Sequence, residues 1–225
     1  MSKIFLPNGT VFEYEKEVLS NETNSAITPE NGKRILEQTH KLFQSRNMEF
    51  FLVFGTLLGA VRDKNIIKGD EDVDVACVDE NSLLYSLPYF KENGLFLVRA
   101  EKGHLYSFRM DSQSYIDVYI FKNLNFSIWK FYCISLYKFI IPKKYFRSFS
   151  KIDFLGKQYT IPSNPEDLLA FWYGKNWRTP VRGHKFIYEV KSAYHWHNFK
   201  RYVIPIIQKM IGWYHWRHFI KNIED

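Results

Sequence analysis

The sequence predicts an α+β fold that resembles an α/β arrangement, a mixed β-sheet packed by helices and followed by a helical, aromatic and basic C-terminal part. Helical and strand-like segments alternate over residues 28–94, three strand-like runs follow, and the composition becomes aromatic and basic after Lys122. Because no linker separates these parts, we expect one domain over residues 1–225. Its core is expected at about residues 30–122, and residues 123–225 are expected to be mainly helical.

Local signals define the first elements. Asn8-Gly9 between short apolar runs predicts a hairpin, and Thr28 before Pro29 predicts the start of a helix. In order, the next segments are expected as a strand at 49–54, a tight turn opening a short helix at 55–63, a strand at 72–78 and a helix at 79–94.

The later elements follow from alternation and from helix caps. The runs "LFLVRA", "HLYSFRM" and "SYIDVYIF" predict three strands, and "IDFLGKQYTIP" predicts a hairpin. Pro165 in the first turn and Gly174 at the end predict a helix in "NPEDLLAFWYG". The tail from about Lys185 is expected to be helical, with a break at Pro205.

The composition bounds the classes of partner and the compartment. The chain has 225 residues and a formal net charge of +7, which favours polyanionic partners. No block of five or six consecutive Lys or Arg appears, so we expect no nucleic acid. Because the N-terminus has no apolar secretory core, we expect Cys77 and Cys133 to be free thiols of a cytoplasmic protein.

An acidic cluster interrupts the apolar run that precedes residue 78. Alternation along a strand places Asp70, Asp72 and Asp74 on one face, with successive carboxylates about 6–7 Å apart. Such a cluster is either a solvated acidic turn or the ligand set of a divalent cation, because buried carboxylates repel one another unless a cation lies between them.

Two further features favour the metal site. Asp117 stands alone between apolar neighbours in "YIDVYIF", so a second strand supplies an isolated acid. Gly55-Thr56 follows a buried strand and opens a helix, where backbone N–H groups and the helix dipole favour phosphate. The pattern predicts a metal-dependent site for a phosphorylated ligand.

The phrase "GTLLGAVRDKNIIKGDEDVDVAC" resembles the signature of the LicD/fukutin-type family of the nucleotidyltransferase superfamily. "IPSNPEDLLAFWYGKNWRTP" is similar to a second family segment, so the resemblance covers about residues 30–180. It implies a nucleotidyltransferase-type mixed β-sheet. One departure concerns Gly69, which stands where the family usually has Trp before the acids.

The resemblance also implies an activity. A LicD-type phosphotransferase moves a phosphorylated alcohol, such as phosphocholine or an alditol phosphate, from a CDP-linked donor to a carbohydrate acceptor and releases CMP. Asp72, Asp74 and Asp117 match the family's metal-binding and catalytic acids for Mg²⁺ or Mn²⁺, and Asp70 matches a further acid of the signature. The family's donor-phosphate motif matches Gly55, Thr56 and Arg62.

Two other functions remain open from the residues. A protein of the same fold can transfer a nucleoside monophosphate from an NTP and release pyrophosphate, and a basic adaptor for membrane or nucleic acid can keep the fold without activity. Three mutually repelling carboxylates argue against the adaptor, because such a protein has no physical reason to keep them. Arg109, on the strand before Asp117, is a further candidate for phosphate binding, or an ordinary surface cation.

Aromatic and basic residues alternate in 126–149 and 194–221. These stretches are either core helices or a contact with an anionic membrane, at which Trp and Tyr reach the headgroups beside Lys and Arg. The second possibility fits an acceptor glycan built on a lipid, at the inner face of the membrane. His195 and His197 form a pair without a third ligand at suitable spacing, which is a weak indication of metal binding.

Overall fold

The computed structural model describes residues 1–17, 26–125, 132–136 and 139–180. The chain divides into two compact units, one formed by Met1–Lys122 with Phe149–Ile161, the other by Asn123–Ser148 with Pro162–Asp225. The first part of the first unit ends at Lys122, after which the composition becomes aromatic and basic. The unit also includes a later hairpin, at Phe149–Ile161.

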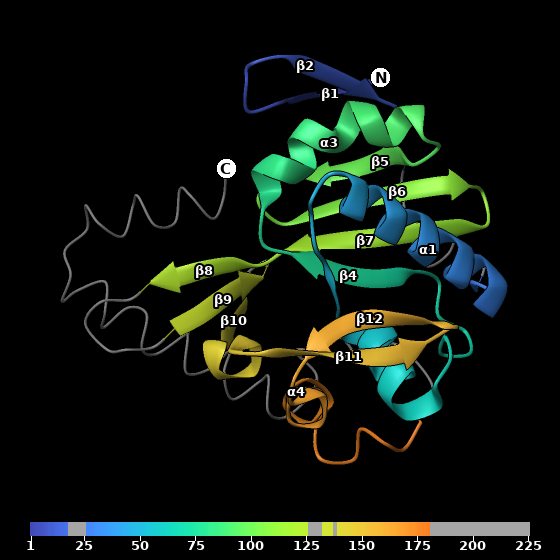
Figure 1. Cartoon of the computed structure of the whole chain (residues 1–225), viewed down its shortest axis with the longest axis vertical. Helices are drawn as coiled ribbons and strands as arrows, with labels where there is room; N and C mark the ends of the chain where they lie inside the picture. Colours follow the sequence, from blue (N-terminus) through green and yellow to red (C-terminus); the bar gives the residue numbers. More distant parts are fainter. Residues whose placement is uncertain (18–25, 126–131, 137–138, 181–225) are drawn as a thin grey trace. The chain divides into compact units, whose positions relative to one another are not determined.

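The first unit contains a central sheet and its helices (Figure 1). Its helical elements are α1 (Pro29–Ser45), α2 (Phe54–Leu58), the π-helical turn η1 (Gly59–Asp63) and α3 (Glu80–Glu92). Its strands are β1 (Ser2–Phe5), β2 (Val11–Tyr14), β3 (Phe51–Leu52), β4 (Val73–Cys77), β5 (Phe96–Glu101), β6 (Leu105–Asp111), β7 (Ser114–Ile120), β11 (Phe149–Phe154) and β12 (Lys157–Pro162).

The central sheet has the strand order β3-β4-β7-β6-β5. Only β4 and β7 are parallel, and the other neighbours are antiparallel, so the predicted mixed sheet is confirmed. The hairpins β1-β2 and β11-β12 lie outside this sheet, at the positions that Asn8-Gly9 and "IDFLGKQYTIP" predict.

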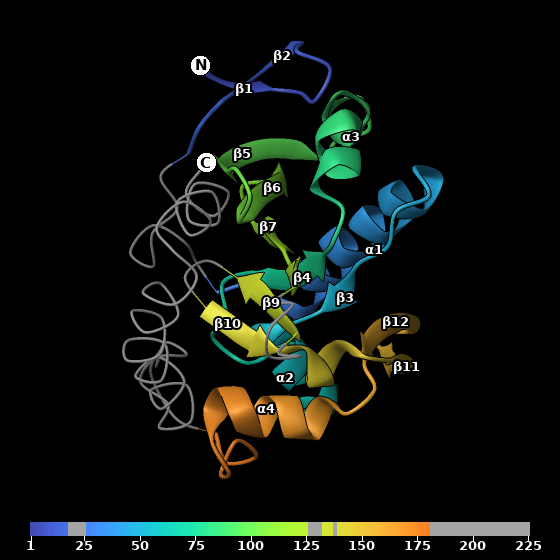
Figure 2. The ribbon, with the colours of Figure 1, turned by 90° about the vertical axis from the view of Figure 1, so that its left-hand side faces the viewer.

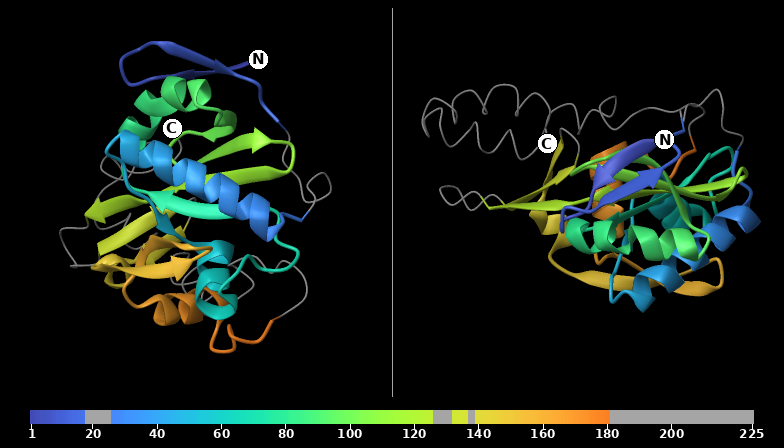
Figure 3. Two further views of the ribbon diagram at one scale, coloured as in Figure 1. Left: turned by 45° about the vertical axis from the view of Figure 1, so that its right-hand side comes forward. Right: turned by 90° about the horizontal axis from the view of Figure 1, so that it is seen from above.

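Helices α1 and α3 lie on the same side of the central sheet (Figure 2 and Figure 3). Thr28 caps α1 by accepting the Asn31 backbone N–H, as its position before Pro29 predicts. Ile35 and Phe43 of α1, and Val73 of β4, have no exposed surface, and the Gly32 backbone approaches Val73. Because strand side chains alternate, this apolar face leaves the opposite face of the same strands to polar groups.

The second unit was expected to be mainly helical, and its described part is not. It contains β8 (Lys122–Asn125), β9 (Tyr132–Leu136), β10 (Phe139–Pro142), the 3₁₀ turn η2 (Lys143–Phe146) and α4 (Pro165–Tyr173). The three strands form one sheet, with β9 and β10 antiparallel. The physical reason is the wealth of isoleucine and aromatic residues, which fit a pleated sheet better than a helix.

Other predictions differ in smaller ways or fall elsewhere. The strand expected at 49–54 is shorter, because Val53 is already the N-cap of α2. The tail predicted as helical from about Lys185, with its break at Pro205, lies outside the described residues, as does the pair His195 and His197.

Candidate metal centre and active site

The turn between β3 and α2 brings the backbone close to the acidic cluster. Phe54 has a φ of 44°, a left-handed conformation that side chains rarely adopt, and strain of this kind gathers at functional sites. A Cβ on Gly55 would lie 2.6 Å from an Asp70 carboxylate oxygen and 3.3 Å from one of Asp74. Gly55 therefore allows the helix start to approach two acids.

Gly59, the second glycine of "GTLLGAVR", is also required by a close approach of neighbouring atoms. A Cβ on Gly59 would lie 2.5 Å from the carbonyl oxygen of Asn65, so only glycine fits where η1 folds back on the following loop. This explains two glycines of the motif by packing alone.

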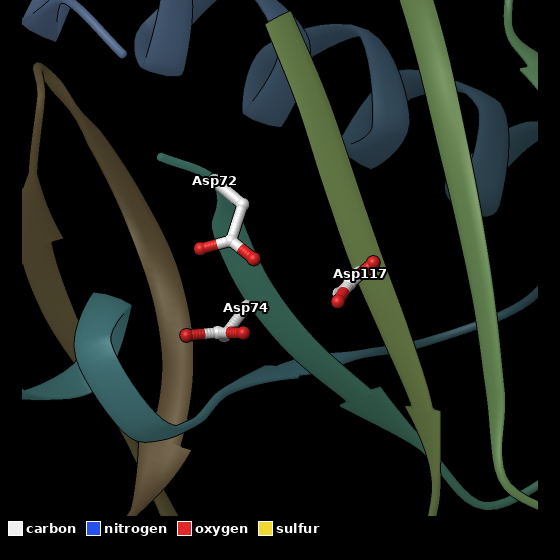
Figure 4. Close-up of side chains that lie close together, drawn as sticks. All are labelled: Asp72, Asp74 and Asp117. Carbon is white, nitrogen blue, oxygen red and sulfur yellow. The ribbon is translucent and has the colours of Figure 1, made fainter. Parts of the chain in front are cut away.

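Three carboxylates converge on the polar face of the central sheet. Asp74 of β4 and Asp117 of β7 are direct neighbours in the parallel register, and Asp72 comes just before β4 on the same side. One oxygen of each lies within 4.8 Å of the others. In Figure 4, Asp72 lies where the chain enters β4, Asp74 projects from β4, and Asp117 faces both from the neighbouring β7. The three acids that the sequence singled out therefore meet in space.

Gly55 and Thr56 hold Asp74 in place. The Gly55 N–H donates to Oδ2 of Asp74 at 3.1 Å, and the backbone N–H of Asp74 donates to Oγ1 of Thr56 at 2.8 Å. Thr56 is buried, with 2% of its surface exposed. In this structure both residues orient an acid, while their contact with phosphate remains a prediction.

Three hydroxyl groups that the sequence reasoning missed contact the acids. Ser107 of β6, fully buried, donates to Oδ1 of Asp117. The Tyr115 and Tyr119 hydroxyls lie beside Asp72 and Asp117, respectively, and act to lower the pKa values of these two acids. Alternation along β7 places both tyrosines on the face of Asp117, so this signal was present in "SYIDVYIF". The contact of Ser107 with Asp117 could not be predicted in this way, because it depends on the register between β6 and β7.

Burial and mutual repulsion shift the ionisation of these acids. Burial, and then the neighbouring aspartates, raise the pKa values of Asp72 and Asp74 well above their usual range. Burial raises the pKa of Asp117 to about 6, although Ser107 and Arg99 act against the shift. A divalent cation would remove this cost, and three carboxylates are the oxygen ligands that Mg²⁺ and Mn²⁺ prefer.

The two predicted arginines each bind a different carboxylate. Arg62 forks onto its neighbour Asp63, with both N···O distances 2.8 Å. Arg109 pairs with Glu17 at 2.5 Å, and its guanidinium lies 5.2 Å from the centre of the Tyr115 ring. Since Tyr115 contacts Asp72, Arg109 is linked to the acids through one side chain, and Asp63 occupies the fork of Arg62.

The backbone conformation at position 69 favours the glycine that stands where the family signature usually has Trp. Its φ is 91°, a conformation that favours glycine, and a Cβ there would meet nothing within 4 Å. This turn therefore places Asp70 beside Gly55 without a side chain at position 69.

We expect the metal-free protein to lose stability as the pH rises through about 6. A carboxyl whose pKa is raised by folding contributes stability while it is protonated and loses it on ionisation. The shift of Asp117 alone, from 3.8 to about 6, corresponds to about 3 kcal/mol, most of which is lost between about pH 4 and 6. The ionisation of Asp72 and Asp74, whose pKa values are raised well above the usual range, extends the loss to higher pH. In EDTA, thermal melts should therefore fall by several degrees between pH 5.5 and 8.

The matched variant for this measurement is Asp74→Asn. It should melt higher than the unchanged protein at pH 8 in EDTA and depend less on pH. Equal slopes for the two proteins would mean that the acidic cluster ionises without cost in the folded state.

Residues 47–164 match the family model described as the LicD/FKTN/FKRP nucleotidyltransferase domain. The chain belongs to this family. The match contains the turn at Gly55, the three acids and all strands of the central sheet. The predicted family and the predicted nucleotidyltransferase-type fold are confirmed.

Two related proteins match this chain over only part of their own length. An uncharacterised protein of Rickettsia typhi is 31% identical over 90 residues, which cover 39% of this chain and 28% of that protein. Human ribitol-5-phosphate transferase FKTN is 23% identical over 176 residues, 74% of this chain and 38% of FKTN. The chain thus spans well under half of these relatives.

Two solved structures are also similar. The lincomycin-bound lincosamide adenylyltransferase LnuA has a TM-score of 0.45 and 13% identity, over 64% of this LicD-family chain and 85% of LnuA. The antibiotic-resistance factor ANT(2'')-Ia has a TM-score of 0.48 and 11% identity, over 85% of this chain and all of that one.

Proposed function

We propose that this chain is a metal-dependent transferase that moves a phosphorylated alcohol, of the phosphocholine or alditol phosphate type, from a CDP-linked donor to a sugar hydroxyl of a cell-surface glycan. The leaving group is CMP. The observation that carries the proposal is the convergence of Asp72, Asp74 and Asp117 within 4.8 Å in a LicD-family domain. The relative FKTN, a ribitol-5-phosphate transferase, supports an alditol phosphate as the transferred group.

Asp72, Asp74 and Asp117, with Asp70 as a further candidate ligand, would hold Mg²⁺ or Mn²⁺. Their raised pKa values fit a site that needs a cation before all of its carboxylates can be charged. When bound, the ion supplies neutralisation of the donor diphosphate.

Asp117 would act on the acceptor. In the transfer, the acceptor oxygen forms a bond to phosphorus, the phosphorus–oxygen bond to CMP breaks, and the acceptor proton moves to a base. Ser107 orients the Asp117 carboxylate through a hydrogen bond, so Asp117 is the candidate base. We assign the proton to Asp117.

The remaining proposed residues bind phosphate groups of the substrates. Gly55 and Thr56 fix Asp74, and the helix start at this turn favours negative charge. Arg62 would exchange Asp63 for a donor phosphate, because a guanidinium binds a carboxylate and a phosphate through the same two parallel hydrogen bonds. Arg109 would exchange Glu17 for a substrate phosphate.

A panel of CDP-linked donors with Mg²⁺ or Mn²⁺, scored by CMP release, tests the function. Release of CMP that depends on a sugar acceptor and stops in EDTA supports it. Pyrophosphate released from an NTP would replace it with nucleotidyl transfer. Absence of both products, with every donor and metal, would leave the non-enzymatic adaptor.

We further propose that the aromatic-basic segment 126–149 contacts the membrane at its cytoplasmic face. None of the helices in the described ranges has the length and apolar character of a spanning segment. Residues 126–131 and 137–138 lie outside those ranges, while Lys144 and Arg147 are described and exposed. The support is therefore the basic, aromatic composition, which suits anionic headgroups.

Replacing Lys143, Lys144 and Arg147 with Gln should reduce co-sedimentation with anionic liposomes, and binding should fall with salt, since surface attraction is screened within about 8 Å at physiological ionic strength. The charge-matched control replaces three exposed lysines elsewhere, Lys41, Lys68 and Lys102. Equal binding to neutral and anionic liposomes would refute electrostatic docking.

A further inference from the structure

The polar face of the central sheet extends beyond Asp117 to an arginine that the proposed transfer does not use. In the strand register Asp74 is opposite Asp117, Asp117 is opposite Ser107, and Ser107 is opposite Arg99. Paired residues share a face, so the four side chains form one row across β4, β7, β6 and β5. Adjacent strands lie about 4.8 Å apart, which places the Arg99 backbone about 10 Å from that of Asp117.

Arg99 is held in a defined position. Its Nε donates to Oε1 of Glu101 at 2.8 Å, and a second guanidinium N–H donates to the same oxygen. The register shift between Leu97 and Arg99 marks a β-bulge, a device that re-aims a side chain. Both partners of the ion pair remain about one third exposed, so the guanidinium is accessible.

The guanidinium also has donors left for a ligand. An arginine carries five N–H groups, and within the described part of the chain Glu101 accepts from two of those of Arg99. A fixed guanidinium with further donors on one edge is suited to a phosphate or carboxylate, which it binds through two parallel hydrogen bonds.

Arg99 lies on the acceptor side of the reaction. Gly55 and Thr56 approach Asp74 from the β3 end of the sheet, and Arg99 lies beyond Asp117 toward the opposite end. In displacement at phosphorus, the nucleophile and the leaving group are in line on opposite sides. With the donor at Gly55 and the base at Asp117, the acceptor has to extend toward Arg99.

We infer that Arg99 binds an anionic group of the acceptor sugar, a phosphate or a carboxylate, and that Glu101 orients the guanidinium for it. The inference rests on the proposed transferase function for the identity of the acceptor, and on the sheet geometry for the anion. The contrasting explanation is a surface ion pair between residues i and i+2, which contributes little and binds nothing.

Binding of simple sugars to the full chain in EDTA tests this without the reaction. Titration calorimetry should show tighter binding of glucose 6-phosphate or glucuronate than of glucose. The preferred anion identifies the group as phosphate or carboxylate. Arg99→Gln should weaken binding of that anion by at least about tenfold, the effect of losing a charge-assisted hydrogen bond, and leave glucose unchanged.

Two variants keep the test decisive. Glu101→Gln removes the ion pair but keeps the cation, so it should retain anion binding within about threefold of the unchanged protein. Arg34→Gln breaks another arginine–carboxylate pair, with Asp111, and should bind like the unchanged protein. Unchanged anion binding in Arg99→Gln, or binding of glucose as tight as that of both anions, would overturn the inference.

The two proposals fail separately. CMP release from a CDP-linked donor together with anion binding that ignores Arg99 would remove only the acceptor site. Anion binding that depends on Arg99, without CMP release from any donor, would refute the proposed transfer and keep only the anion-binding site at Arg99.

Discussion

Asp117→Asn is expected to lower the rate of CMP release by at least about a hundredfold, the usual lower bound for the loss of a positioned acid–base group. Asn keeps the size of the side chain and can still accept from Ser107, but it lacks the charge and the basicity that proton removal needs. Affinity for the CDP-linked donor should change far less, because Asp72 and Asp74 remain. CMP release and donor affinity have to be measured on the same protein.

The control for Asp117→Asn is Asp153→Asn, which removes one charge from an exposed position on another strand. It should turn over normally. Near-normal turnover in the Asp117 variant would take this residue out of the active site, and with it the assignment of β7 as a strand that carries a catalytic acid. Loss of donor affinity equal to the loss of rate would instead make Asp117 a donor-binding residue.

The double variant Asp72→Asn, Asp74→Asn is expected to abolish stabilisation by divalent cations. A ligand that binds only the folded state raises the free energy of unfolding, by about 2.7 kcal/mol at a hundredfold excess over its Kd, and so raises the melting temperature. Mn²⁺ or Mg²⁺ with a CDP-linked nucleotide should therefore raise the melt of the unchanged protein and leave that of the variant in place. Because it lacks two buried like charges, the variant should be no less stable than the unchanged protein in EDTA at pH 8.

A charge-matched pair gives the control. Asp153→Asn with Asp167→Asn removes the same two charges from exposed positions and should keep the full response to metal. A response that survives in the Asp72, Asp74 variant would place the cation elsewhere in the chain.

Much of the first unit followed from short-range chemistry. Thr28 and Pro29 predict the start of α1 because the cap and the ring act on the adjacent turn. Period-two patterns predict β4 and β7 because alternate side chains must be apolar on the face that packs against α1. The same local rule failed after Lys122, where mixed aromatic and basic residues gave no period that separates strand from helix.

The sequence by itself determined which acids stand out, since carboxylates on apolar strands are costly wherever those strands lie. It did not determine that β4 pairs with β7 in parallel, which sets Asp74 directly beside Asp117 and brings Ser107 and Arg99 into the same row. Nor did it show that Thr56 holds Asp74, or that Arg62 and Arg109 lie against Asp63 and Glu17. The reason is that register and pairing depend on contacts between residues far apart in the chain, and only the folded sheet brings those residues together.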